Sequence, residues 1–239
     1  MSSAADLTGK VLRHERAIVA IGIALLAGLC WWYLAAGAGM EVEAMPHMAA
    51  QPPLGALITM WWLMMLAMML PSAAPAILLY AQVRRQRGRE SVVQPWIFAA
   101  GYALVWLAFS LAAGAIQSRV TFADPRLASV LLIAAGAYQL SPLKNACLRQ
   151  CQSPARFLSR HWRPGVGGAL RLGALHGAYC VGCCWMLMAL LFVGGVMNFA
   201  WIAALTLIVG VEKLVPRGEW IGRAAGIALI GWGAFRLLS

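Results

Sequence analysis

Long apolar runs separated by short polar segments are the main pattern of this chain. About 20 helical residues cross a hydrocarbon core of about 30 Å. The runs lack the two-residue alternation of barrel strands, and lipid offers no water to unpaired backbone groups, so helices are expected. The sequence therefore predicts an all-α, polytopic transmembrane helix bundle. It has seven spans, or six if a short run does not cross: Ala17–Ala36, Leu54–Val83, Pro95–Ile116, Leu127–Leu140, Ala174–Val196, Phe199–Glu212 and Trp220–Leu237.

The placement of basic residues predicts the orientation of these spans. With the N-terminus inside, 16 of the 19 Lys and Arg residues fall in inner segments, as the positive-inside rule requires. The chain is 62% hydrophobic and only 11% charged, which excludes an ordinary soluble domain. Its net charge of +11 is spread over short tracts between apolar runs, so nucleic acid is not the expected partner. We predict a multi-pass protein of the bacterial inner membrane, with the lipid bilayer as its surroundings.

No separate soluble domain is evident, and residues 1–239 are interpreted as a single transmembrane domain. Two pairs of short, similar segments suggest an internal repeat. LLIAAGAYQL resembles ALIGWGAFRLL, and WWLMMLAM resembles CWMLMALL. They would relate residues 54–142 to residues 174–238 as inverted repeats, an arrangement that places binding sites between the two halves.

The fifth run begins with HGAYCVGCCWMLMALL, which carries unusual chemistry for an apolar segment. His176, Cys180, Cys183 and Cys184 lie at offsets 0, 4, 7 and 8, so on a helix they share an arc of about 80–100°. If the span begins near Ala174, Cys183 and Cys184 lie about 14 Å in, near the bilayer centre. These four residues are candidate metal ligands, and the alternative is that the cysteines only pack as small apolar side chains.

The second run carries two methionine stripes and two prolines. Because this span runs from outside to inside, Met64 to Met69 are expected near the same depth as Cys183 and Cys184. Proline inside a helix frees a backbone carbonyl that must find another partner. If the two helices face each other, thioethers meet thiols; the alternative is methionine as core filler. The candidate stripe is Met60, Met64 and Met68, followed on its face by Pro71 and Pro75, while Met65 and Met69 form a second stripe.

Thiolates and thioethers are soft ligands, and together they favour Cu(I), with zinc as the alternative. Two segments between the runs carry further donors. The inner segment has Cys147, Cys151 and His161, and the cysteine pair is a candidate for receiving or releasing the ion. A soluble delivery or acceptor protein is a possible partner. The outer segment, interpreted either as a loop or as a collector of copper, has Met40, Glu41, Glu43, Met45, His47 and Met48.

Glu212 and Lys213 end the sixth run, where charges are costly and are usually paired or functional. The structural interpretation is an ion pair, with Pro216 and Gly218 ending the helix. The functional interpretation makes Glu212 a proton acceptor, or a residue that orients His176 behind the metal ligands.

Four blocks, MWWLMMLAMMLPSAAP, AYQLSPLKNACLRQC, HGAYCVGCCWMLM and GVMNFAWIAALTLIVGVEKLVP, resemble an uncharacterised family of bacterial integral membrane proteins predicted to bind metal. The resemblance covers Leu54 to Pro216 and gives no substrate. It does not cover the first run or the outer segment. The matched positions are Met64, Met68, Met69, Pro71, Lys144, Cys147, Cys151, His176, Cys180, Cys183, Cys184, Glu212 and Lys213.

Three functions are compatible with these patterns. The first is membrane-embedded binding or transfer of a soft metal ion. The second is thiol–disulfide exchange by the Cys180-x-x-Cys183 pair, although the inner side of the membrane is reducing. The third is a metal-free scaffold. No nucleotide-binding G-x-x-x-x-G-K-[ST] motif occurs, so the chain is not expected to pump by nucleotide hydrolysis, and a binding protein is expected rather than an enzyme.

Overall fold

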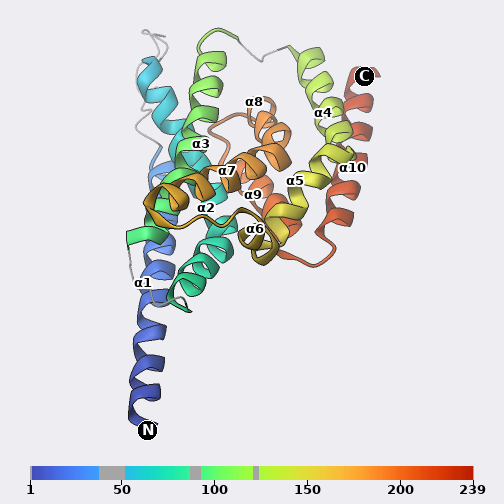
Figure 1. Cartoon of the computed structure of the whole chain (residues 1–239). Coiled ribbons are helices and arrows are strands. Elements are labelled where there is room, and N and C mark those ends of the chain that lie inside the picture. The colour runs from blue at the N-terminus through green and yellow to red at the C-terminus, as the bar shows by residue number, and fades with distance from the viewer. Residues whose placement is uncertain (1, 38–51, 87–92, 121–123, 239) are drawn as a thin grey trace.

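The computed structural model describes residues 2–37, 52–86, 93–120 and 124–238, with side chains from residue 16 onward. Every regular element in these ranges is a helix (Figure 1). The helices are α1 (Ser2–Ala35), α2 (Leu54–Gln86), α3 (Val93–Gln117), α4 (Pro125–Gln139), α5 (Pro142–Gln152), α6 (Pro154–His161), α7 (Gly165–Ala189), α8 (Leu191–Gly194), α9 (Phe199–Leu214) and α10 (Gly218–Leu238). The predicted all-α class is confirmed for the described residues.

Within the described residues, five helical segments are long and apolar enough to cross a membrane. They are Arg16–Ala35, α2, α3, Gly165–Gly194 and α10. A sixth crossing arises if α4 and α5, which bend by 63° at their junction, together form one span. Helix α9 covers the predicted sixth run, but 16 residues reach only about 24 Å. The predicted count of seven therefore stays a prediction.

Local sequence explains where these helices break. Ser141 caps α5, its hydroxyl accepting a hydrogen bond from the Lys144 backbone N–H at 3.2 Å, and Pro142 occupies the first helical turn. This cap turns the chain away from α4. By contrast, α2 continues through Pro71 and Pro75. The Ala67 carbonyl, which Pro71 leaves without a helical donor, accepts a hydrogen bond from the Trp31 indole at 3.1 Å.

Glycines set the closest contacts between helices. A Cβ atom at Gly101 or at Gly173 would collide with the backbone of the other helix, so α3 and α7 pack at backbone distance. Helices α4 and α10 lie side by side in the same way (Figure 1), and a Cβ at Gly136 would come within 2.5 Å of the Gly226 carbonyl oxygen.

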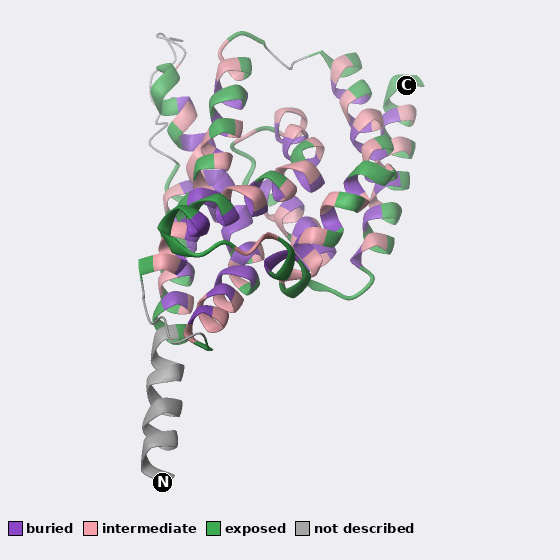
Figure 2. Ribbon diagram, viewed as in Figure 1, coloured by how far each residue is buried: buried purple, intermediate pink, exposed green. Residues whose placement is uncertain are grey.

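Buried side chains concentrate where α2, α7 and α9 meet, and exposed ones face outward (Figure 2). Large apolar side chains are among the most exposed, including Trp32, Leu207 and Phe235 at 74%, 68% and 70%. An apolar exterior of this kind is typical of helices surrounded by lipid.

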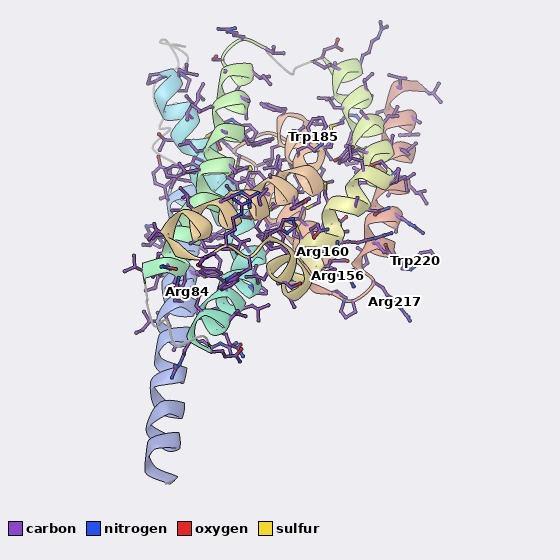
Figure 3. The ribbon with its side chains drawn as sticks, in the orientation of Figure 1. Arg84, Arg156, Arg160, Trp185, Arg217 and Trp220 are labelled. Carbon is purple, nitrogen blue, oxygen red and sulfur yellow. The ribbon has the colours of Figure 1, made fainter. Side chains whose placement is uncertain are left out.

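The start of α1 and the end of α10 lie at opposite ends of the bundle (Figure 1). Figure 3 shows Arg84, Arg156, Arg160 and Arg217 toward the end from which α1 projects. This arrangement is the one that an inner N-terminus and inner basic tracts would produce.

Candidate functional site

Three buried cysteines on α7 form the centre of the candidate site. Cys180, Cys183 and Cys184 are exposed by 2%, 1% and 1%. Their spacing places them on one helix face, as the sequence predicts. The Cys184 Sγ atom lies 3.8 Å from the Met69 Sδ atom of α2. A thiol and a thioether from the two predicted helices therefore do meet.

The methionine in this contact belongs to the second stripe rather than to the candidate stripe. Met60, Met64 and Met68 are buried on α2, at 0%, 0% and 2% exposure. The contact that the structure describes between an α2 thioether and a cysteine of α7 is nevertheless the one made by Met69. Packing of the whole bundle fixes the rotation of α2, and stripe spacing alone does not indicate which face meets the cysteines.

Helix α5 packs against α7 and brings two more thiols to it. The Cys151 side chain lies close to that of Cys183. Cys147 packs against Gly182, where an added Cβ would lie 2.8 Å from the Cys147 Sγ atom. The Tyr138 hydroxyl donates a hydrogen bond to the Gly182 carbonyl and holds α4 against the same turn. Cys147 is half-buried and Cys151 is 9% exposed. The cysteine pair of the inner segment thus extends the sulfur cluster toward the surface.

His176 lies one turn before Cys180 and is 2% exposed. Its ring is surrounded by the rings of Phe98, Tyr102 and Phe157, at centroid distances of 6.0, 5.9 and 5.1 Å. Its Nδ1 atom is buried without a hydrogen-bond partner among the described residues. A buried imidazole nitrogen in this state is available to a ligand.

Lys213 of α9 reaches into the sulfur cluster. Its Nζ atom donates to the Cys180 Sγ atom at 2.9 Å and lies 3.6 Å from the Met69 Sδ atom and 3.9 Å from the Cys184 Sγ atom. The Ser72 Oγ atom is 3.4 Å away. Lys213 is 5% exposed, so this ammonium is a buried charge in contact with sulfur. The residue forms no ion pair with its neighbour Glu212, contrary to the structural interpretation of the sequence.

The Glu212 carboxylate is bonded to side chains of α4 and α5. Its Oε2 atom accepts a hydrogen bond from the Lys144 Nζ atom at 2.6 Å, and its Oε1 atom accepts from the Gln139 Nε2 atom at 2.7 Å. The side chains of Lys144 and Glu212 are 1% and 2% exposed. A Cβ at Gly222 of α10 would collide with both charged groups, so only glycine leaves them room. These bonds direct Glu212 away from His176, and the predicted orienting contact is therefore absent from the described residues.

Tyr102 of α3 also belongs to the site, and no pattern in the sequence predicts it. Its hydroxyl lies 3.0 Å from the Cys180 Sγ atom and donates to the Met69 carbonyl at 3.0 Å. It ties the first cysteine of the motif to the helix that carries the thioether. A tyrosine in an apolar run looks like packing in the sequence, and only the fold brings it to the sulfur cluster.

The described residues contain no group of three or more His, Cys, Asp or Glu side chains already arranged to hold a metal ion. Two of the thiols are hydrogen-bonded within their own helix. Cys183 and Cys184 both donate to the Cys180 carbonyl, at 3.1 and 2.9 Å. A rotation about χ1 would turn either thiol away from that carbonyl. The donors fit a soft cation, but binding requires this rearrangement.

Several predicted residues have other surroundings. The Nδ1 atom of His161 is 3.0 Å from the Phe157 carbonyl oxygen, and its ring packs on Tyr179. The outer segment lies outside the described residues, and its role as a collector of copper stays a prediction. It comprises Met40, Glu41, Glu43, Met45, His47 and Met48.

Comparison with known proteins gives one result. No curated protein and no solved structure shows a significant match to the chain. The sequence profile of PpoB2, described as a copper chaperone, matches residues 58–236. This match covers well over half of the chain and includes the cysteine motif, Met69, the α5 cysteines and Lys213. The chain therefore belongs to the PpoB2 copper chaperone family.

Proposed function

We propose that this protein binds Cu(I) inside a membrane-spanning helix bundle and passes the ion to a partner protein. The observation that carries the proposal is the convergence of buried sulfur atoms from three helices. Cys180, Cys183 and Cys184 of α7 lie with Met69 of α2 on one side and Cys151 of α5 on the other. Soft sulfur donors in a site without carboxylate ligands suit Cu(I) far better than hard cations. The copper chaperone description of the family supports the same metal.

Within this proposal the cysteines of α7 hold the ion, and His176 is an additional donor one turn away. Cys151 and the half-buried Cys147 accept the ion on its way to or from the surface of the bundle. The α5 pair is suited to this role because Cys151 is buried close to Cys183 while Cys147 is partly open. The protein lies in the bacterial inner membrane with its N-terminus inside, and seven crossings are the proposed topology.

Copper retention by the purified protein tests this proposal. The detergent-solubilised chain, kept reduced and free of oxygen, is loaded with Cu(I), exchanged against a chromogenic Cu(I) chelator and analysed for metal. We expect about one ion per chain to survive a chelator that strips weak sites. The variant Cys180→Ser/Cys183→Ser/Cys184→Ser is expected to retain less than about a tenth of that amount.

The matched control is Cys30→Ser. Cys30 is also a buried free cysteine, but it lies on α1. It is expected to leave copper retention unchanged. Equal retention by the wild type and the triple variant would contradict the proposed site. Strong retention of zinc but not of copper would identify zinc as the bound metal. Reversible oxidation of the Cys180/Cys183 pair without metal binding would favour thiol–disulfide exchange.

A further inference from the structure

Three charged side chains are buried around the sulfur cluster, and their pairing is unequal. Lys144, Glu212 and Lys213 are 1%, 1% and 5% exposed. Both carboxylate oxygens of Glu212 are already occupied, one by Lys144 and the other by Gln139. Among the described residues, Lys213 therefore keeps no carboxylate partner, and its positive charge faces the sulfur atoms.

A buried ammonium is costly unless opposite charge or good hydrogen-bond acceptors surround it. An ammonium has three N–H donors. Lys213 has three short contacts for them: Cys180 Sγ at 2.9 Å, Ser72 Oγ at 3.4 Å and Met69 Sδ at 3.6 Å. Serine and methionine carry no charge. The groups in contact with Lys213 that become negative on binding a metal are thiols, because thiols coordinate as thiolates.

The negative charge of a copper–thiolate complex would explain why a buried ammonium lies beside these thiols. One Cu(I) ion bound by two of the three α7 cysteines as thiolates, with the third still a neutral thiol, has a net charge of −1, and this charge would lie in a site from which water is excluded. A fixed ammonium beside the ligand sulfurs brings the total to zero. Copper remains Cu(I) throughout, each coordinating thiol gives its proton to solvent, and no electron is transferred.

We propose that Lys213 is the built-in counter-cation of the copper complex and determines how tightly the site holds its ion. This inference rests on the proposed function, since it assigns a role within the same site. The Lys144–Glu212 pair is consistent with that role, because Lys144 and Gln139 already occupy both oxygens of the neighbouring carboxylate. Hydrogen bonds from Lys213 to the ligand sulfurs also lower the energy of the sulfur lone pairs, as they do in other thiolate–metal sites.

Three substitutions of Lys213 separate charge from packing. Lys213→Met removes both the charge and the hydrogen bonds, Lys213→Gln keeps hydrogen bonding without charge, and Lys213→Arg keeps the charge. The measured quantity is the apparent Cu(I) dissociation constant, obtained by competition with the chromogenic chelator. We expect the Met and Gln variants to bind at least about 100-fold more weakly and the Arg variant to stay within about tenfold of the wild type.

Two further measurements exclude a merely structural effect. The double variant Lys144→Met/Glu212→Gln removes a buried lysine as part of a neutral pair, and its dissociation constant is expected to stay within about threefold of the wild type. In copper-saturated protein, the sulfur-to-copper charge-transfer absorption is expected to move to lower energy in Lys213→Met. Lys213→Arg, which still donates to sulfur, should leave that band near its wild-type position.

The possible failures are distinguishable. If the wild type binds no copper, or binds no more than the triple serine variant, the proposed function itself is wrong. If the wild type binds copper while Lys213→Met and Lys213→Gln bind it equally or more tightly, only the role of Lys213 is wrong. The same conclusion follows if the double variant loses as much affinity as Lys213→Met. If Lys213→Met does not fold, the comparison between Gln and Arg decides, because these two differ in charge while both retain N–H donors.

Discussion

Removing one partner of the buried Lys144–Glu212 pair is expected to destabilise the bundle far more than removing both. The Nζ–Oε2 distance is 2.6 Å and both side chains are almost fully buried. At an effective dielectric constant of about 20, this distance corresponds to an attraction of about 6 kcal/mol. Desolvation of both charges offsets much of that attraction when the pair is intact.

In Lys144→Met the attraction between the two charges is lost. Glu212 stays buried with its charge, so the cost of its desolvation remains. The carboxylate keeps its hydrogen bond from Gln139, which limits the damage. We therefore expect a loss of about 3–5 kcal/mol in the free energy of unfolding. In Lys144→Met/Glu212→Gln the amide oxygen still accepts from Gln139, and neither charge of the pair remains. This double variant is expected to lie within about 2 kcal/mol of the wild type.

Unfolding in mixed detergent micelles, followed by tryptophan fluorescence, measures these differences for the wild type, both single variants and the double variant. The quantity of interest is the coupling energy of the double-mutant cycle, expected to be at least about 2 kcal/mol. Additive single effects, or a double variant that is the least stable of the four, would refute the assignment of a desolvated ion pair. A small effect of Lys144→Met alone would show that water reaches Glu212.

Three further predictions concern the sulfur cluster. Cys147 is half-buried while Cys183 is 1% exposed, so a maleimide should label Cys147 at least about tenfold faster, as peptide mass analysis of partly labelled protein would show; comparable rates would contradict the packing of α5 on α7. Gly182→Ala places a Cβ 2.8 Å from the Cys147 sulfur, so it should displace that side chain and speed its labelling. The control Gly167→Ala, on the same helix with nothing within 4 Å of its Cβ, should leave the labelling rate unchanged. Tyr102→Phe removes the hydroxyl that bonds both a cysteine sulfur and a backbone carbonyl and should reduce the free energy of unfolding by about 1 kcal/mol, measured by the same detergent titration; no change would mean that these contacts contribute nothing.

The all-helical fold and the cysteine face could be predicted because they depend on local pattern. Continuous apolar runs force helices, and offsets of 4, 7 and 8 force one face. The start of α7 is harder to predict from the sequence. It begins at Gly165, nine residues before the predicted Ala174, and its early turns pack against α3, with Gly173 against the Phe98 backbone and Gly101 against the Leu170 backbone. The depth calculated from Ala174 for Cys183 therefore stays a prediction.

The remaining parts of the site depend on tertiary packing. Stripe spacing shows that α2 has two methionine faces, but the rotation of α2 decides that Met69 meets Cys184. Sequence adjacency suggests that Glu212 and Lys213 pair with each other, yet successive helical residues point about 100° apart and find different partners. Tyr102 is joined to Cys180 across 78 positions of sequence, a contact that no periodicity encodes.

The opposite attachments of Glu212 and Lys213 limit how α9 can move. Lys144 and Gln139 hold one side of its last turn, and Cys180 holds another. Sliding the helix by one residue would shift its side chains by about 1.5 Å and turn them by about 100°, so both anchors would break together. Helix α9 is thus locked in register between the α4–α5 bend and the thiols of α7, and any shift of that bend must carry the ammonium of Lys213 with it.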